Sequence, residues 1–436
     1  MVRRLAGTLS CCHGSGLALI ADLNAGQNAK LCRLCAFPLR HSVIDLASSP
    51  LAETYLSPDC LDQPELFYPL HAKVCESCFL VQVAQAVAPA DLFSEYAYFS
   101  SFSDSWVQHA KNYVEGITAR FALGPESQVI EVASNDGYLL QFFREEQIPV
   151  LGIEPARNVA QAAFEKGIPT VVEFLGESIA RSLVKQGKQA DLIVANNVLA
   201  QVPDLHDFVS GLKLLLKPNG VMTLEFPHLL SLIGENQFDT IYHEHFSYFS
   251  LKTAENLFAR HKLAVFDVEK LETHGGSLRL YVTHSSGVKT LNPSLATLRE
   301  EEKHARLENL DTYSLFSSRV RRVKRDFLAF LIEAREKNKS IVAYGAPAKG
   351  NTFLNYCGIR TDLIDYTVDR NPYKHGKLLP GVRIPIFPIA KIKDTKPDFL
   401  LILPWNLKAE IMAQIAFIRE WGGQFVVAIP SVEVYT

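Results

Sequence analysis

Residues 241–250, IYHEHFSYFS, place two histidines and a glutamate between tyrosines, in a stretch otherwise rich in Leu and Phe. Imidazole and carboxylate side chains at this spacing can bind a metal ion or transfer protons. The same pattern also fits a buried aromatic patch whose histidines bond only to backbone groups. This stretch leaves the three interpretations open, so the chemistry has to be inferred from the rest of the chain.

Four of the eight cysteines form two CxxC pairs, Cys32 with Cys35 and Cys75 with Cys78, separated by short strand-like segments. Two close pairs of thiolates match the tetrahedral coordination of Zn²⁺, and a site closed by four cysteines is structural. In a reducing compartment, paired CxxC units favour metal binding over disulfides. We therefore expect a zinc ribbon that stabilises a region too small to build its own core. The alternative is a set of unrelated cysteines on hairpins.

A third group of polar residues lies where strands are expected to end. The segment 131–137, EVASNDG, follows one predicted strand and precedes a helix, and a small-residue turn there lets a ligand approach the backbone. The next strand ends at Glu154, whose carboxylate can accept both hydroxyls of a ribose. This order predicts an adenosyl ligand, with tight packing of the loop as the alternative. The expected cofactor-binding residues are Glu131, Ser134, Asn135, Asp136, Gly137, Glu154, Asn196 and Asn197.

The scaffold for these residues has to be large, because 436 residues predict two or three domains. A net charge of −3 argues against nucleic acid or an anionic membrane surface as the main partner. From about residue 127 strand-like and helix-like segments alternate, which predicts a parallel sheet with helices on both faces. A long charged helix near 293–338 precedes a second α/β region that begins KSIVAYGAPAKG.

The beginning of the chain imitates a signal peptide, but Gly, His and Ser interrupt its apolar run almost at once. We expect residues 1–29 to form a poorly ordered extension. No segment of the sequence approaches the roughly 20 apolar residues of a membrane span, which favours a cytoplasmic location.

From residue 30 to the end, the chain resembles the S-adenosylmethionine (SAM)-dependent C-methyltransferases that act on nucleotide-activated keto-deoxysugars. The segments that carry the resemblance include CRLC, CESC, EYAYFSSFSDSW, EVASNDGYLL, GIEPA, NNVLAQVPD, EFPH, YHEHFSYFS, HGGSLR, YGAPAKGNTFLNYCG, VDRNPYKHGKLLPG and LPWN. The resemblance implies a zinc ribbon-like module, a central class I Rossmann-like SAM methyltransferase domain, and a C-terminal Rossmann-like α/β domain. We expect them over 30–104, 105–290 and 340–436, with a helical connection over 291–339.

The resemblance also implies a reaction in which a base removes a proton beside a ketone and the enolate attacks the methyl group of SAM. His245 is the expected base, because imidazole titrates near the operating pH. Glu244 is expected to orient it or to contact a sugar hydroxyl, and Tyr242 to donate to the enolate oxygen. Tyr96 or Tyr98 would supply another phenol to the sugar pocket.

Two further positions qualify this expectation. For His243 the favoured interpretation is a histidine bonded to backbone, and a metal site at the HEH segment is disfavoured because sulfonium is already activated. Gln201 stands where relatives commonly have histidine, and glutamine cannot act as an acid or base at neutral pH. Any proton transfer by that histidine would be lost or moved in this chain.

Two glycine-bearing segments are expected to hold the nucleotide sugar. HGGSLR, over 274–279, offers close approach of the backbone and a guanidinium for a diphosphate, although Arg279 could equally form a salt bridge within its domain. In the C-terminal region, backbone N–H groups at the start of a helix, together with Lys349, suit phosphate. The expected substrate-binding residues are Ser277, Arg279, Tyr344, Gly345, Ala346, Lys349, Gly350, Asn351, Asp369, Lys374 and Lys377.

The sequence therefore predicts a SAM-dependent C-methyltransferase for a nucleotide-linked keto-deoxysugar, with one structural Zn²⁺, acting as a monomer or small homo-oligomer. A related enzyme with a different acceptor is the nearest alternative. A nucleotide-dependent oxidoreductase is disfavoured because Ser134 and Asn135 replace the glycines of a dinucleotide fingerprint. A non-catalytic zinc-ribbon interaction protein would leave the Tyr, Glu and His cluster unexplained.

Overall fold

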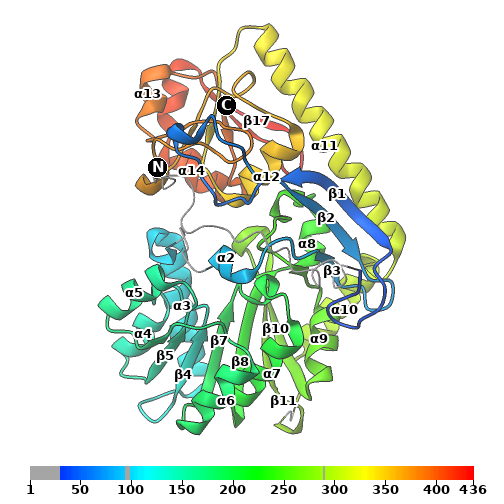
Figure 1. The fold of residues 1–436 in the computed structure, drawn as a ribbon, viewed down its shortest axis with the longest axis vertical. Helices are drawn as coiled ribbons and strands as arrows, with labels where there is room; N and C mark the ends of the chain where they lie inside the picture. The colour runs from blue at the N-terminus through cyan, green and yellow to red at the C-terminus, as the bar shows by residue number, and fades with distance from the viewer. Residues whose placement is uncertain (1–29, 94–98, 288–289) are drawn as a thin grey trace, which may run out of the picture. The chain divides into compact units, whose positions relative to one another are not determined.

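The computed structural model describes residues 30–93, 99–287 and 290–436, drawn as a ribbon in Figure 1. The predicted extension over 1–29 lies outside these residues, as do Tyr96 and Tyr98. The described chain divides into two compact units. The first unit contains residues 30–45 and 71–320, and the second contains residues 46–70 and 321–436. Among the described residues, no helix is both long and apolar enough to cross a membrane.

A small sheet carries the cysteine pairs, with strand order β1-β2-β3-β9. Strand β3 pairs antiparallel with β2 and, on its other side, with β9, where Val81 lies opposite Tyr248. A short strand from the middle of the chain therefore completes a sheet that is otherwise built near the N-terminus. The strands are β1 (His41–Ser49), β2 (Tyr68–Val74), β3 (Val81–Val83) and β9 (Ser247–Tyr248), and the helix that follows β3 is α2 (Pro89–Phe93).

The first unit is built on a larger sheet with strand order β10-β11-β8-β7-β4-β5-β6, visible in the lower part of Figure 1. All neighbours are parallel except that β11 runs antiparallel to both β10 and β8. The strands are β4 (Val129–Val132), β5 (Val150–Ile153), β6 (Thr170–Val171), β7 (Ala190–Asn196), β8 (Leu216–Pro227), β10 (Leu263–Leu271) and β11 (Ser277–His284).

Strand order reverses between β4 and β7: the chain builds outward from β4 through β5 to β6, then returns to the other side of β4 for β7 and β8. Ligands of open α/β sheets bind at such a switch point, outside the carboxyl ends of the strands. Helices α3 (Asp104–Phe121), α4 (Leu140–Glu145), α5 (Arg157–Glu165), α6 (Glu177–Lys185), α7 (Leu205–Leu215), α8 (Leu229–Gly234) and α9 (Leu251–Arg260) accompany this sheet.

The elements follow from local sequence. Strand β4 is buried at each residue, as expected of a central parallel strand. Helix α7 begins where the Asp204 carboxylate accepts from the backbone N–H groups of His206 and Asp207, and Pro218 lies in the strand that follows. The predicted charged helix divides into α10 (Pro293–His304) and α11 (Leu310–Glu336), because Arg306 adopts a left-handed φ of 58°.

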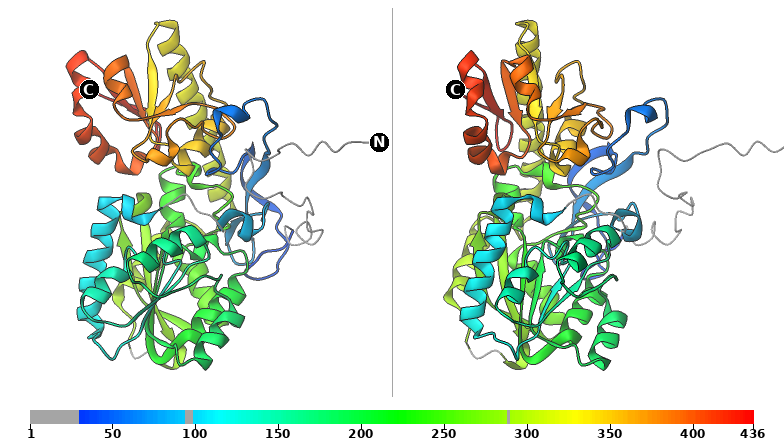
Figure 2. Two further views of the ribbon diagram at one scale, coloured as in Figure 1. Left: turned by 60° about the vertical axis from the view of Figure 1, so that its left-hand side comes forward. Right: turned by 90° about the vertical axis from the view of Figure 1, so that its left-hand side faces the viewer.

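The second unit has a sheet of order β14-β13-β12-β15-β16-β17, parallel except for β17 at its edge. Figure 2 shows this sheet, in orange and red, from two further directions. Its core joins strand residues such as Val342 and Phe425 to Ile392 and Ile411 of the flanking helices. The elements are β12 (Ile341–Tyr344), α12 (Ala348–Cys357), β13 (Thr367–Val368), β14 (Ile386–Phe387), α13 (Lys391–Thr395), β15 (Phe399–Ile402), α14 (Lys408–Gln414), β16 (Gln424–Val427) and β17 (Glu433–Tyr435).

Candidate active site and metal centre

The four predicted metal ligands converge in the first unit. The Sγ atoms of Cys32 and Cys78 are 3.5 Å apart, as are those of Cys35 and Cys75. All four Sγ atoms lie within 4.8 Å of one another. Tetrahedral Zn²⁺ with bonds of about 2.3 Å needs sulfur separations of roughly 3.8 Å, so these cysteines fit a zinc ion.

The two CxxC turns have the same backbone design. Ala36 donates its N–H to the Cys32 carbonyl and Phe79 donates to the Cys75 carbonyl, each over 2.8 Å. Both donors have a φ of 59°, so each turn closes through a left-handed residue just after its second cysteine. Hydrogen bonding from Cys78, opposed by burial and helped by Gln82, lowers the pKa of Cys32 to about 5, which favours the thiolate that binds metal.

The predicted cofactor loop lies at the switch point and has a strained backbone. Ala133, Asn135 and Gly137 all have positive φ, of 58°, 48° and 75°. A Cβ atom at Gly137 would also lie only 2.9 Å from a side-chain carbon of Ile168, so glycine is required by both conformation and space. Such a turn brings the backbone of the loop close to whatever lies outside β4.

Two buried carboxyl groups face this loop. Glu154 accepts hydrogen bonds from the backbone N–H groups of Asn135 and Ala156, each over 2.9 Å, and burial raises its pKa. Burial, followed by the charges of Asp136 and Glu154, raises the pKa of Glu131 well above the usual carboxyl range. Carboxyl groups whose charge is poorly compensated suit a ligand that carries positive charge.

Several buried polar atoms at the ends of β4 and β7 lack a hydrogen-bond partner within the described residues. They are Ser134 Oγ, Asp136 Oδ1, Asn196 Oδ1 and Asn197 Oδ1. Buried polar atoms of folded proteins are normally hydrogen-bonded, so a cluster of such atoms indicates the place of a polar ligand. The structure thus brings the predicted cofactor residues to one edge of the sheet, where SAM fits their chemistry.

The segment that follows the predicted tyrosines is bound to the cofactor loop. The backbone N–H of Ser100 donates to Asn135 Oδ1 over 2.9 Å, and that of Ser101 donates to Asp136 Oδ2 over 3.4 Å. Tyr96 and Tyr98 lie outside the described residues, so their predicted contribution to the sugar pocket stays a prediction.

The YHEH segment forms a turn between α8 and β9. His245 donates its backbone N–H to the Tyr242 carbonyl over 3.0 Å, which brings the two side chains together with ring centroids 4.1 Å apart. The Tyr242 hydroxyl lies 3.0 Å from His245 Nε2, and His245 Nδ1 lies 3.1 Å from the carbonyl oxygen of Thr240. A carbonyl only accepts, so Nδ1 carries the proton and the Nε2 lone pair faces Tyr242.

The two residues between them are buried. His243 is 2% exposed and Glu244 is 4% exposed, against the partly exposed Tyr242 and His245. Burial raises the pKa of Tyr248 well above its usual value, and the nearby charge of Glu244 adds to that shift. The turn therefore pairs Tyr242 with His245 and buries His243 and Glu244.

The 3-10 turn that holds Gln201, Leu199–Gln201, contacts this segment directly. The Ala200 carbonyl accepts the backbone N–H of Phe246 over 2.7 Å. Gln201 thus follows Ala200, which binds the residue directly after the YHEH turn.

A buried ionic network near the end of β8 went unnoticed in the sequence. The Glu225 carboxylate accepts from Arg279 over 3.0 Å, from His109 over 3.0 Å and from Thr273 over 2.7 Å. Burial opposes the charge, but the bond from His109 and the positive charge of Arg279 outweigh it and lower the pKa of Glu225 to about 2. Arg279 also donates to Glu269 over 3.1 Å. Of the two roles expected for Arg279, diphosphate binding and a salt bridge within its domain, the structure shows the salt bridge.

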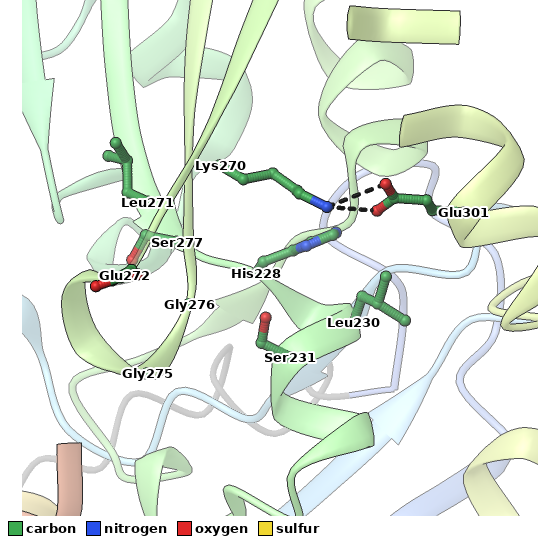
Figure 3. Close-up of a pocket in the computed structure, with 10 residues that line it drawn as sticks. All are labelled: His228, Leu230, Ser231, Lys270, Leu271, Glu272, Gly275, Gly276, Ser277 and Glu301. Carbon is green, nitrogen blue, oxygen red and sulfur yellow. Dashed lines mark hydrogen bonds and ion pairs between the residues drawn. The ribbon is translucent and has the colours of Figure 1, made fainter. Parts of the chain in front are cut away.

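The predicted substrate residue Ser277 borders a cavity of about 380 Å³ where β8 and β10 end. Figure 3 shows the ion pair between Lys270 and Glu301 beside the buried His228. His228 in turn lies 2.7 Å from a Glu302 carboxylate oxygen. This cavity shares the sheet edge of the cofactor loop.

In the second unit, a compact polar cluster surrounds the loop after β12. The Ala346 N–H donates to Asp369 Oδ2 over 2.7 Å, and the Ala346 carbonyl accepts from Tyr55 over 2.7 Å and from Lys374 over 2.9 Å. The Lys374 ammonium also lies 5.0 Å from the Tyr55 ring centroid. The sequence carried no signal for Tyr55, which lies 291 residues before Ala346.

The remaining predicted substrate residues lie on both sides of this cluster. Gly345 has a φ of 90°, and Gly350 packs so closely against Leu403 that a Cβ would lie 2.9 Å away. Lys349 binds Asn406 and covers the Trp405 ring at 4.6 Å. The Tyr344 hydroxyl and both side-chain polar atoms of Asn351 are buried without a hydrogen-bond partner in the described chain, and Lys377 is exposed.

Comparison with known proteins assigns the family. Residues 32–93 match the model of a zinc binding domain, 106–268 that of a methyltransferase domain, and 272–430 that of a C-methyltransferase C-terminal domain. The chain is 34% identical over 403 residues to C-methyltransferase NovU from Streptomyces niveus, covering 92% of this chain and 96% of that one. The chain belongs to the C-methyltransferase family. The predictions of a SAM-dependent C-methyltransferase with a zinc-binding domain, and of its α/β fold class, are confirmed.

Solved structures also resemble parts of this C-methyltransferase. Magnesium protoporphyrin IX methyltransferase from Synechocystis PCC 6803 is 13% identical, with 41% of this chain and 83% of that chain covered and a TM-score of 0.33. A SAM-dependent methyltransferase from Anabaena variabilis is 16% identical, with coverage of 44% and 99% and a TM-score of 0.33. Both likenesses span less than half of the C-methyltransferase.

Proposed function

We propose that this C-methyltransferase acts on a nucleotide-activated keto-deoxysugar and methylates the carbon next to its ketone. The observation that carries the proposal is the pair of contacts on His245. Its Nδ1 lies against the Thr240 carbonyl, so the basic Nε2 faces the Tyr242 hydroxyl. Methylation at carbon needs a base for a weakly acidic C–H group, and neutral imidazole supplies one near pH 7.

In this mechanism His245 Nε2 removes the proton from the carbon beside the ketone, and the electron pair of that C–H bond forms the enolate. Tyr242 turns its hydroxyl from Nε2 to the enolate oxygen and stabilises the developing charge. SAM held by the loop after β4 would supply a methyl group that sulfonium already activates for the new carbon–carbon bond, and its sulfur would keep the electrons of the broken bond. His245 releases its proton to solvent.

The charge on the proposed substrate also has complementary groups in the second unit. Lys374 donates to the Ala346 carbonyl in the loop after β12, and Lys349 follows this loop in helix α12, which begins at Ala348. Helix N-termini and ammonium groups together favour diphosphate. We propose that this loop binds the nucleotide diphosphate.

The test is mass spectrometry of a panel of nucleotide-linked keto-deoxysugars incubated with the enzyme and SAM. We expect one member to gain a single methyl group, with carbon–carbon connectivity shown by NMR. Methylation of a ketone that carries no nucleotide, with none of the panel modified, would replace the proposal with a different acceptor class.

A further inference from the structure

Arg33 lies inside the first CxxC turn, yet its side chain leaves the turn and reaches the segment that leads out of the YHEH turn. Its guanidinium donates to the carbonyl of Phe246, to Ser247 Oγ over 3.2 Å and to the carbonyl of Val83 over 2.8 Å. The same group lies 5.5 Å from the Phe246 ring centroid. One side chain thus joins β3 and β9 at the point where β9 begins.

A second side chain ties the same strands to a metal ligand. Gln82, on β3, is 2% exposed and accepts the backbone N–H of Arg33 over 3.0 Å. Its amide also donates to Cys32 Sγ over 3.2 Å. In the sheet, Gln82 lies directly opposite Ser247 on β9. The first CxxC turn, β3 and β9 therefore form one hydrogen-bonded block.

The YHEH turn is attached to this block without an intervening loop. His245 is followed directly by Phe246, whose N–H donates to Ala200 and whose carbonyl accepts from Val83 and Arg33. The guanidinium therefore binds the peptide group between Phe246 and Ser247, one residue after His245, while the Phe246 N–H holds the preceding peptide group against Ala200. A planar guanidinium can hold three acceptors in fixed directions, which an ammonium cannot do.

We propose that Arg33 is a positioning residue for methyl transfer, and that it makes the zinc-bound turn the support for the His245 side chain. The inference rests on the proposed role of His245 as base. Arg33 touches neither cofactor nor substrate in this scheme. It acts by holding residues 246–247 in place, so that the base keeps its direction.

The test compares Arg33→Lys, in the full-length zinc-loaded enzyme, with Arg40→Lys, which changes an exposed arginine of the same module. We expect Arg33→Lys to lower kcat by about a hundredfold, the loss that a misplacement of about 1 Å can cause. The KM values, the affinity for SAM and the zinc content should stay at parental values. An unchanged kcat, or a fall that tracks loss of zinc, would overturn the proposal.

Hydrogen exchange provides a measurement that needs no substrate. We expect the peptide that contains Phe246 to exchange faster in Arg33→Lys than in the parent, while peptides from β4 and β7 keep their protection. Ser247→Ala removes a single acceptor of Arg33, so we expect a smaller change in the same direction. This variant provides the test if Arg33→Lys does not fold. Unchanged exchange in the variants would refute the support by Arg33.

The two measurements also separate this proposal from the proposed function. If the parent enzyme methylates none of the nucleotide sugars, or His245→Asn is fully active, the proposed function fails. The exchange measurement would still decide whether Arg33 holds the segment.

Discussion

The hydrogen bond from His245 Nδ1 to the Thr240 carbonyl matters at the scale of single residues, because it decides which imidazole nitrogen is basic. Replacing His245 with Asn keeps a polar side chain but removes the group that titrates. We expect kcat to fall by about 10²–10⁴-fold, the usual contribution of a general base, while SAM binds as in the parent. Steady-state kinetics and calorimetric titration measure the two quantities, and parental turnover would contradict the assignment.

Glu225 allows a prediction about pH. Its pKa in the folded protein is about 2, below the value of an unfolded carboxyl, so its ionised form stabilises the fold at neutral pH. That contribution is present above the unfolded pKa and is lost as pH falls toward 2. We expect Glu225→Gln to lower the free energy of unfolding by about 3 kcal/mol at pH 7.

Near pH 3, Glu225 of the parent is still ionised in the folded state but takes up a proton on unfolding, so most of its stabilising contribution is lost. The difference in unfolding free energy between parent and Glu225→Gln should therefore fall to less than about half of its value at pH 7. Urea denaturation of both proteins at the two pH values measures it. Glu410→Gln, at an exposed position, serves as a control. A deficit that does not depend on pH would show that the loss comes from packing instead.

Residue types and spacing near one another in the sequence predicted part of the site. The cysteines converge because each CxxC is a local turn, and the cofactor residues converge because parallel strands end at one edge. The pairing of Tyr242 with His245 depends on the turn between them, which residue types and spacing alone do not specify. The partners of Arg33 and Glu225 are dozens to hundreds of residues away in the sequence, so no local pattern indicated them.

At the scale of elements, the zinc-binding turns are expected to hold the small sheet together. Removing one ligand leaves three thiolates, and closed structural sites require four. We expect the parent to contain about one zinc per chain and Cys32→Ser or Cys75→Ser to lose it, with a lower thermal midpoint. Elemental mass spectrometry and calorimetry check this.

His243→Ala is the matched control, since His243 is buried in the YHEH turn and the metal is assigned to the cysteines. It should retain the zinc. Loss of zinc from His243→Ala, with zinc retained in Cys32→Ser, would move the metal to the histidines.

Element types were easier to predict than strand partners. Alternating apolar strands and amphipathic helices predicted β4 to β8 with their helices, because burial on both faces leaves near-continuous apolar runs. The reversed strand β11 and the addition of β9 to the N-terminal sheet were missed. Strand β9 has only two residues, too few to show the alternation of apolar and polar residues that marks a strand. Its partner, β3, is far away in the sequence.

At the scale of the whole molecule, the division into two units predicts separate responses to ligand. SAM at a hundred times its Kd should stabilise the unit that binds it by about 2.7 kcal/mol. We expect hydrogen exchange to slow in peptides of the first unit around β4 and β7, with little change in β12 and β15. NAD at equal concentration should protect neither, and protection by NAD alone would contradict the cofactor assignment.

The second unit is assembled from two separate stretches of chain. Gly381 donates its N–H to Glu65, 316 residues earlier, and Leu56 bridges to Leu378. On a ribosome that adds about 5–20 residues per second, residues 46–70 must wait on the order of tens of seconds for these partners. Residues 71–320 emerge during that interval and can complete their own sheet. The enzyme is therefore expected to acquire its cofactor-binding unit first during synthesis, and the other unit only after residues 321–436 have emerged.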